Sequence, residues 1–490
     1  MQKVIAKNEK SFMFTQPKPF YLIFFIEFWE RFGFYATQGI LAKFFVVSLG
    51  FSQEKSFATF GAFSALVYGL VVAGGYLGDK ILGTKRTIVL GTIVLFIGYF
   101  MMAFSNSRTI FIALGVICTG NGLFKANPSS LLSKCYEKND IRIQGAFTLY
   151  YMSINIGSFI ALILSPTLAS HFGWNKSFML SGLGLVIALG NYLLMKNTIS
   201  NIGSKGDFSK LHLKKLIIII VAIIGVSFLC EFFFFLQHLI IAHTFLWIVT
   251  GLTLLCFFRE MVKEVAINRK KMLVALVLMI EAIIFFTLYQ QMPTSLNFFA
   301  ISNVNHNFFG TNIDPQIFQS LNPFWIIVLS PLFAFLYGKY KKEGKDLAVT
   351  SKFALGMTLC GISFTLLYFA KFFSNSDGIV SAGWVVGSYF FQSAGELLIS
   401  ALGVAMVAEL VPERIMGFIM GMWFLTTAIA GVTGGILASF MAISKSEVMD
   451  KVQSLNIYTN TFGEIGIITL IISIIMWSFV SKLNKYICEK

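Results

Sequence analysis

Three charged side chains stand close together in an otherwise apolar stretch near the N-terminus, IEFWERFGFYATQ. They are Glu27, Glu30 and Arg31, and at 3.6 residues per turn they share one helix face with Tyr35 and Gln38. Carboxylates beside a guanidinium can exchange a proton or bind a charged group. Each charge at mid-bilayer costs roughly 2.5 to 3.5 kcal/mol, so we expect this face to point into a cavity. The alternative is a structural charge cluster that fixes helix packing.

The composition shows what surrounds these charges. Of 490 residues, 56% are hydrophobic and 12% are charged, whereas a soluble domain has about 25% charged residues. The sequence therefore indicates a polytopic membrane protein. The net charge of +15 does not indicate a nucleic-acid partner, because the basic residues lie in short loops between apolar spans. The six cysteines are isolated, so we expect no disulfide, no metal and no cofactor.

Other classes of function lack their sequence features. An intramembrane enzyme would need a nucleophile with a base, or a metal set, and neither H-E-x-x-H nor G-x-S-x-G occurs. A signalling receptor is disfavoured because no sizeable soluble segment is present to transmit a signal. We therefore predict that the protein is not an enzyme.

Fourteen apolar segments are long enough to cross a hydrocarbon core of about 30 Å as helices. Most of the 38 basic residues fall in one set of loops and tails, so the positive-inside rule predicts that both termini are cytoplasmic. The predicted spans are 20–48, 56–78, 86–105, 109–133, 144–169, 174–195, 214–238, 241–259, 271–299, 322–340, 350–373, 380–409, 414–442 and 461–484.

The connections divide these spans into groups. A polar stretch after the sixth span reads as a flexible linker, and the next two spans are so apolar that nearly every face could meet lipid, so we interpret them as an inserted pair. Six plus six spans then remain, the arrangement of major-facilitator transporters, which hold substrate at the midplane. We predict an all-α integral membrane protein with that fold, with 12 core helices and an inserted hairpin. The expected parts are a cytoplasmic tail 1–19, a six-helix bundle 20–196, a cytoplasmic linker 197–213, the hairpin 214–260 and a second bundle 261–487.

One loop carries a superfamily motif. GGYLGDKILGTKR, between the second and third spans, resembles the cytoplasmic loop of major-facilitator proteins. Its Asp79 can meet a helix N-terminus or a basic residue across the interface of the two halves. We interpret Asp79 as part of a gate.

Several motifs together give a more specific resemblance. Glu27-x-x-Glu30-Arg31-Phe32 followed by Tyr35 resembles the signature of the proton-dependent oligopeptide transporter family. FTLYYMSINIGSF resembles the second signature of that family, and GNGLFKANPSS resembles its fourth-helix segment. Further similar runs, including GELLISALG, continue through the second half. The motifs occur in family order over nearly the whole chain.

The resemblance implies a symporter that imports dipeptides and tripeptides with protons across the cell inner membrane by alternating access. It implies proton coupling through Glu27, Glu30, Arg31 and Lys125, with the two cations also meeting the peptide carboxylate. Glu396 would bind the peptide ammonium. A snorkelling lysine is the alternative for Lys125, and a packing glutamate for Glu396. The remaining substrate-binding positions that it implies are Tyr35, Tyr68, Tyr151, Asn155, Asn322 and Ile399.

Two positions depart from the family pattern. Gln38 and Gln290 stand where many members carry an arginine and a glutamate that are thought to pair at the outer gate. Two amides can keep a hydrogen-bonded gate, but one candidate proton carrier is lost. Glu281, nine residues before Gln290, either takes over the role of proton carrier or is a structural charge.

A drug or metabolite exporter of the same superfamily is the rival hypothesis. It would share the core helices and the Asp79 loop but would not need a clamp for a zwitterion, formed by Arg31, Lys125 and Glu396. Peptide-like drugs are a further substrate class to test. We expect lipid as the surrounding partner, no nucleic acid, and a monomer.

Overall fold

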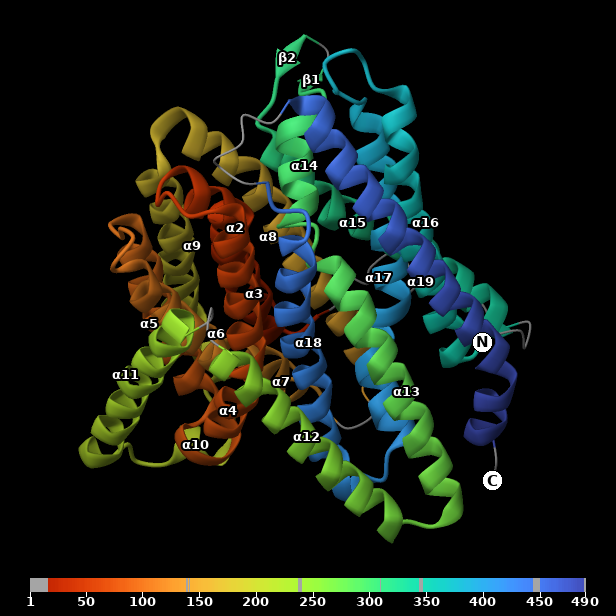
Figure 1. The fold of residues 1–490 in the computed structure, drawn as a ribbon. Coiled ribbons are helices and arrows are strands. Elements are labelled where there is room, and N and C mark those ends of the chain that lie inside the picture. Colours follow the sequence, from red (N-terminus) through yellow and green to blue (C-terminus); the bar gives the residue numbers. More distant parts are fainter. Residues whose placement is uncertain are drawn as a thin grey trace, which may run out of the picture. The chain divides into compact units, whose positions relative to one another are not determined.

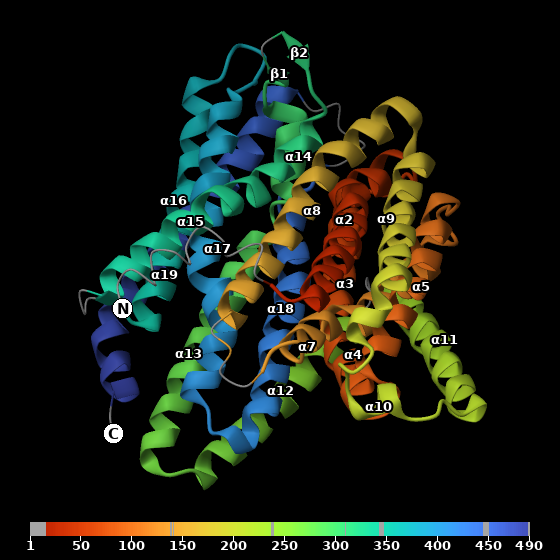
Figure 2. The same ribbon diagram turned by 180° about the vertical axis from the view of Figure 1, so that it is seen from behind.

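The computed structural model describes residues 16–137, 140, 142–236, 240–308, 310–342, 347–443 and 450–488. Helices dominate this part of the chain (Figures 1 and 2). Its strands are β1 (Asn307–Phe308) and β2 (Thr311–Asn312), a two-stranded antiparallel pair between the predicted spans 271–299 and 322–340. Eleven helical segments of the described residues are long and apolar enough to cross a membrane. The helices are consistent with the fourteen predicted spans, although that count itself stays a prediction.

Contacts between residues group the chain into two compact units, which we describe separately. The first contains the described residues of Met1–Gln38 and Leu70–Phe232, and the second those of Gly39–Gly69 and Phe233–Lys490. The boundary falls inside α2 (Lys18–Val47). The predicted division into two six-helix bundles and a hairpin stays a prediction.

The first unit is built around α5, which packs against α6 and α9, while α8 packs against α9. A Cβ on Gly157 of α8 would lie 2.6 Å from the Phe28 carbonyl oxygen, and one on Gly184 of α9 would lie 2.9 Å from that of Trp29. Because these two glycines have no side chain, the backbone of α2 can approach the backbones of α8 and α9 closely. The helices of this unit besides α2 are α4 (Val71–Tyr76), the π-helical η2 (Leu77–Leu82), α5 (Thr84–Ala103), α6 (Ile110–Lys125), α7 (Asn127–Ser133), α8 (Ile143–Phe172), α9 (Trp174–Met195), η3 (Lys196–Ile199), α10 (Lys205–Phe208) and α11 (Leu213–Leu236).

In the second unit, α16 packs against α17 and α19, α13 against α18, and α15 against α17. α3 runs along α18, where a Cβ on Gly61 would lie 2.7 Å from the Gly431 carbonyl oxygen. The elements of this unit are α3 (Gln53–Gly69), α12 (Ile240–Lys263), α13 (Ala266–Tyr289), α14 (Ser295–Asn303), η4 (Pro315–Ser320), α15 (Leu321–Lys342), α16 (Val349–Phe369), η5 (Ala370–Phe373), α17 (Ala382–Leu410), η6 (Glu413–Ile415), α18 (Met416–Ser439) and α19 (Lys451–Cys488), together with the strands above.

One predicted span, 271–299, is interrupted, whereas the spans 56–78 and 109–133 each have a one-residue irregularity, at Leu70 and Ala126, where φ and ψ stay helical. The span 56–78 divides into α3 and α4, the span 109–133 into α6 and α7, and the span 271–299 into α13 and α14. Proline explains two of these three features, because its ring clashes with a preceding turn. Pro128 lies in the first turn of α7, and Pro293 lies between α13 and α14.

These three places lie beside predicted site residues. Lys125 is the last residue of α6, Gln290 is the C-cap of α13, and Tyr68 is the penultimate residue of α3. Interrupted backbone at membrane depth is tolerated where it is buried in protein or lines a cavity. Discontinuous helices are also where transporters place their binding sites. Of these three positions, Gln290 lies at the interrupted backbone, and the functional roles of all three stay predictions.

The linker after the sixth span is ordered against the first unit, not loose as its composition predicts. Asp207 Oδ1 accepts hydrogen bonds from the backbone N–H groups of Lys85 (3.0 Å) and Arg86 (3.3 Å). Its Oδ2 accepts the Ser204 N–H at 2.9 Å, and Ser204 Oγ accepts the Thr84 N–H at 2.9 Å. Side chains of the linker therefore cap the first turn of α5, whose N–H groups lack intrahelical partners.

Candidate functional site

The charged face of α2 forms a buried cluster. Glu27, Glu30 and Arg31 are each no more than 2% exposed. Arg31 Nη2 donates to Glu30 Oε1 at 2.7 Å, and its Nε donates to the other oxygen of the same carboxylate. Arg31 Nε also lies 3.6 Å from Glu27 Oε1. This two-pronged contact is the strongest geometry that a guanidinium and a carboxylate can form.

A second cation completes this cluster. Lys125, at the end of α6, interacts electrostatically with Arg31, Glu30 and Glu27. When all four groups are ionised, two positive charges balance two negative ones. Buried charges persist only when they are compensated in this way. A single added proton would therefore leave the cluster with a net positive charge.

Two tyrosines of the first unit that were not predicted as site residues adjoin these charges. The Tyr150 hydroxyl on α8 neighbours the Glu27 carboxylate, and the fully buried Tyr99 on α5 interacts with Glu30. At normal hydrogen-bond geometry, neither Glu27 Oε2 nor the Tyr99 hydroxyl has a partner among the described residues. Tyr150 lies in the FTLYYMSINIGSF motif and could have been found there. Tyr99 lies in a plain apolar run, which gives no such signal.

Three further predicted residues belong to the first unit. Tyr35 on α2 and Tyr151 on α8 are half-buried. Asn155, one turn after Tyr151, is 6% exposed, and its Nδ2 donates to the Tyr151 carbonyl oxygen at 2.9 Å. These side chains are neutral hydrogen-bonding groups.

Asp79 lies away from the buried cluster, in η2. Its Oδ1 accepts hydrogen bonds from Lys134 Nζ at 3.0 Å and from Ser130 Oγ at 3.1 Å. Its side chain is 49% exposed. The basic partner of Asp79 in the structure thus belongs to the same unit, whereas the two predicted partners were a helix N-terminus or a basic residue across the interface of the halves. Its gating role stays a prediction.

The second unit holds a different polar centre. Glu396 on α17 is 8% exposed, and its Oε2 accepts a hydrogen bond from Asn322 Nδ2 of α15 at 2.7 Å. The Tyr289 hydroxyl of α13 donates to Asn322 Oδ1 at 3.2 Å, and Ser393 Oγ accepts from Asn322 Nδ2 at 3.1 Å. These bonds fix the amide orientation of Asn322. Within the described part of the chain, no cation lies within ion-pair distance of Glu396.

The other candidates of the second unit lie in packed positions. Ile399 is fully buried, and its Cδ1 lies 2.8 Å from where a Cβ on Gly356 would stand, so it fits between α17 and α16. Gln290 Nε2 donates to Ser64 Oγ of α3 at 2.9 Å. Tyr68 of α3 is half-buried. In the first unit, Gln38 is also half-buried.

The structure thus brings together two sets of predicted residues. Glu27, Glu30, Arg31 and Lys125 form one cluster, and Glu396 with Asn322 forms the other. Glu281 of α13 stands apart from any ion pair of the described residues, is 5% exposed, and its Oε2 has no hydrogen-bond partner there. The roles of all these residues stay predictions.

Known proteins resemble the chain over almost its full length. The family model described as the POT family matches residues 85–458. Dipeptide and tripeptide permease B of Aeromonas hydrophila is 52% identical over 96% of this chain and 94% of its own length. The protein of the same name from Salmonella typhimurium is 51% identical over 97% of both chains.

Solved structures agree with this sequence likeness. Tetrameric PepTSo2 is similar at a TM-score of 0.85 and 33% identity, covering 96% of this chain and 99% of that one. A bacterial homologue of the human drug peptide transporters PepT1 and PepT2 gives a TM-score of 0.85 and 35% identity, covering 96% and 100%. The predicted all-α membrane fold of the major-facilitator type is therefore confirmed, and the chain belongs to the POT family.

Proposed function

We propose that this protein is a symporter that imports dipeptides and tripeptides together with protons. The relatives named above as dipeptide and tripeptide permeases support the substrate class. They give no support to the rival hypothesis of a drug or metabolite exporter, and they are permeases rather than enzymes. The coupling ion would be the proton, with no cofactor.

The observation that carries the proposal is the charge-balanced cluster of Glu27, Glu30, Arg31 and Lys125. Protonation of Glu27 or Glu30 would weaken the attraction between these carboxylates and Arg31, which would then be able to bind a peptide carboxylate. One charge that crosses 100 mV releases about 2.3 kcal/mol. At 1.36 kcal/mol per decade, that is enough for roughly fifty-fold accumulation of peptide.

The ammonium end of the peptide is assigned to Glu396. This carboxylate is buried, and its described partner, Asn322, is a neutral amide. A buried carboxylate without a cation lacks most of the compensation that it needs. A peptide ammonium would supply the missing positive charge.

Neutral groups would bind the part of the peptide that all substrates share. Tyr35, Tyr151 and Asn155 of the first unit, and Tyr68 of the second, offer hydrogen bonds to a peptide backbone. Phe286 and Trp423 of the second unit pack edge to face, with ring centroids 6.3 Å apart. We assign these rings, with Ile399, to side-chain pockets. Apolar pockets of this kind discriminate weakly between side chains.

Three residues are assigned to gating: Gln38, Gln290 and Asp79. Gln290 hydrogen-bonds to the neutral hydroxyl of Ser64, so its described partner there is not a charged group. We further propose that the protein lies in the cell inner membrane with both termini cytoplasmic, because its basic residues concentrate in one set of loops. The monomer stays a prediction, and PepTSo2 is tetrameric. Peptide-like drugs stay a substrate class to test.

Uptake by proteoliposomes tests the function. Radiolabelled dialanine is added outside, with an inward proton gradient, without it, and with the gradient collapsed by a protonophore. We expect accumulation only with the gradient, and counterflow when the vesicles are preloaded with unlabelled dipeptide. Gradient-independent accumulation would contradict symport, and absence of dipeptide counterflow would contradict the substrate class.

A further inference from the structure

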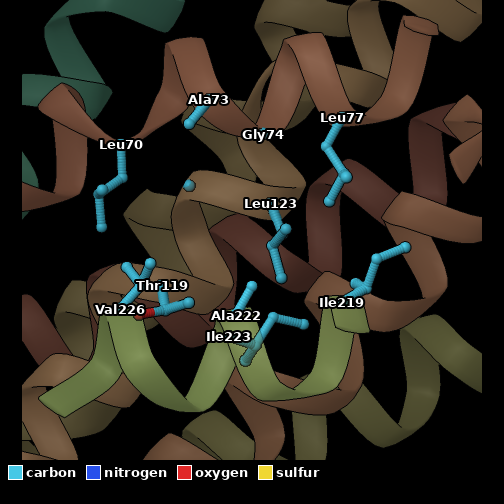
Figure 3. A pocket seen from close by; sticks show the side chains of 11 residues that line it. Leu70, Ala73, Gly74, Leu77, Thr119, Leu123, Ile219, Ala222, Ile223 and Val226 are labelled. Carbon is cyan, nitrogen blue, oxygen red and sulfur yellow. The ribbon is translucent and has the colours of Figure 1, made fainter. Parts of the chain in front are cut away.

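An apolar cavity of about 210 Å³ lies inside the first unit, between α4, α6 and α11. Figure 3 shows Ile219, Ile223 and Val226 of α11 opposite Leu70 and Leu123. Of the described side chains that line it, only Thr119 is polar. Its hydroxyl already donates to the Gly115 carbonyl oxygen at 2.9 Å and accepts from Ser227 Oγ at 3.1 Å.

Hydrocarbon suits this cavity better than water does. A cavity of roughly 150 Å³ with an aliphatic lining stays dry and takes up apolar molecules, because water needs two to four polar partners. The present cavity is larger, and its one hydroxyl is committed. It also lies among membrane-spanning helices, where the surrounding solvent is made of lipid acyl chains.

α11 contacts the other helices of the first unit at both ends of the cavity. At one end, Ser227 bonds Thr119, and a Cβ on Gly115 would lie 2.4 Å from the Ser227 carbonyl oxygen. At the other end, Lys215 Nζ donates to the Ile81 carbonyl oxygen. Twelve residues separate Lys215 from Ser227, which is about 18 Å of helix. The opening therefore lies between two contacts that join α11 to the rest of the unit.

Positive charge gathers at the Lys215 end of this opening. Lys80 and Lys214 are exposed, and each is next in sequence to one of the two residues in the Lys215–Ile81 contact. The nearest acidic group along the chain, Asp79, is already paired with Lys134. A lysine ammonium has three donors, so Lys215 keeps donors beyond the one that Ile81 uses. An apolar cavity with lysines at one end is complementary to an anionic lipid.

We propose that this cavity binds one acyl chain of an anionic phospholipid, and that Lys215, Lys80 and Lys214 bind the phosphate headgroup. The lipid fills the space between α11 and the α4–α6 pair. The outer face of α11, with Ile218 and Val221 each 62% exposed, lies outside this site. The site is independent of the peptide-binding residues and of the proposed transport function.

Lipid binding to the purified full-length protein tests the site. Delipidated protein is titrated with palmitoyl-oleoyl phosphatidylglycerol or with the matching phosphatidylcholine, and native mass spectrometry counts the bound lipids. Ala222→Phe places a ring in the cavity, whereas Val221→Phe places the same ring on the exposed face one residue away. We expect Ala222→Phe to weaken phosphatidylglycerol binding about tenfold, which is 1.4 kcal/mol, and Val221→Phe to leave it unchanged.

A second pair of variants, one at the site and one control, tests the headgroup contact. Lys215→Gln should abolish most of the preference for phosphatidylglycerol over phosphatidylcholine, while Lys196→Gln, at an exposed lysine, should leave it intact. A phosphatidylglycerol with a diazirine in its acyl chain gives a readout on the wild type alone, and we expect its crosslinks on α4, α6 or α11.

Three outcomes would overturn the proposal. Equal binding by the two phenylalanine variants would exclude the cavity, and crosslinks confined to other helices would do the same even if Ala222→Phe fails to fold. Equal affinity of the wild type for the two lipids would exclude the anionic headgroup. In each case normal dipeptide uptake by the wild type would leave the transport function standing.

Discussion

The two polar centres of this protein handle buried charge in opposite ways. In the first unit, Arg31 donates two hydrogen bonds to Glu30 and also lies near Glu27. Both carboxylates are therefore compensated by a cationic side chain of the protein. In the second unit, Glu396 accepts a hydrogen bond from the neutral amide of Asn322. The carboxylates of the first centre have cationic neighbours from the protein, whereas Glu396 of the second has none within ion-pair distance among the described residues.

This difference suggests a division of labour. A self-compensated cluster changes its charge when it gains a proton, so it suits coupling. A carboxylate with only neutral support gains most from a cationic ligand, so it suits recognition. The predictions below test whether proton effects and ligand effects separate along this line.

Glu30→Gln should have the largest effect, because it fixes one carboxyl of the cluster in a form that resembles its protonated state. We expect gradient-driven dipeptide uptake to fall to background, while peptide exchange between equilibrated compartments survives. Proteoliposome assays with and without the gradient measure both. Glu54→Gln, at a first-turn residue of α3, is the control. Equal loss of driven uptake and exchange would indicate a folding role instead.

Arg31→Ala should rank second, since a charge-assisted contact contributes about 1.5 to 3 kcal/mol. We expect binding of a free dipeptide to weaken by at least about tenfold, and that of its C-terminal amide to change far less. Lys125→Ala should show the same preference. Calorimetric titration with both ligands measures the ratio, and an equal loss for the two ligands would refute the carboxylate assignment.

Glu396→Gln should weaken binding of a free dipeptide by about tenfold, because the neutral amide cannot pair with the peptide ammonium. An N-acetylated dipeptide has no ammonium, so it should bind the wild type poorly and be little affected. The two ligands and two proteins form a double cycle. A coupling near zero would mean that Glu396 and the peptide N-terminus do not meet.

Tyr289→Phe should have a smaller effect at the same centre. It removes only the hydroxyl that donates to Asn322 Oδ1, and one neutral hydrogen bond contributes about 0.5 to 1.5 kcal/mol. We expect dipeptide affinity to fall about threefold, with the proton dependence of uptake unchanged. A changed proton dependence would connect this centre to coupling and would contradict the proposed separation between coupling in the first unit and recognition in the second.

Surface ion pairs give the smallest expected effect. Arg414 Nη2 lies 2.8 Å from Glu264 Oε1, and its hydrogen bond holds the pKa of the Glu264 carboxyl below its ordinary value of 4.5. A lowered pKa stabilises the folded state above pH 4.5, and this contribution disappears as the pH falls through the folded-state pKa. Arg414→Gln should therefore lower the Tm slightly at pH 7 and not at all in acid. A Tm difference that persists in acid would indicate packing instead.

The helices and the charged cluster could be predicted because their signals are local. Apolar runs of sufficient length locate the spans, and Glu27, Glu30 and Arg31 stand out because charge is rare in such runs. Hydropathy does not report backbone continuity, so the break beside Gln290 was not predicted. Pro293 was visible in the sequence, but a proline can also kink a continuous helix.

Partners distant in the sequence could not be predicted. Asn322 and Glu396 were each named, but their hydrogen bond joins residues 74 positions apart. Asp79 was expected to meet a helix N-terminus or a basic residue of the other half, and its partner is Lys134 of its own unit. Spacing along one helix specifies a shared face, whereas pairing between helices depends on packing that no local pattern reports.

The aspartate that caps α5 also sets an order of events during synthesis. Asp207 supplies the acceptor for the Lys85 N–H, which lies 122 residues earlier in the chain. A ribosome adds about 5 to 20 residues per second, so α5 waits on the order of ten seconds for its cap. Through that interval the nascent first turn of α5 depends on water for those amides. The linker thus makes a late contact, which forms only after the six predicted spans before it have been synthesised.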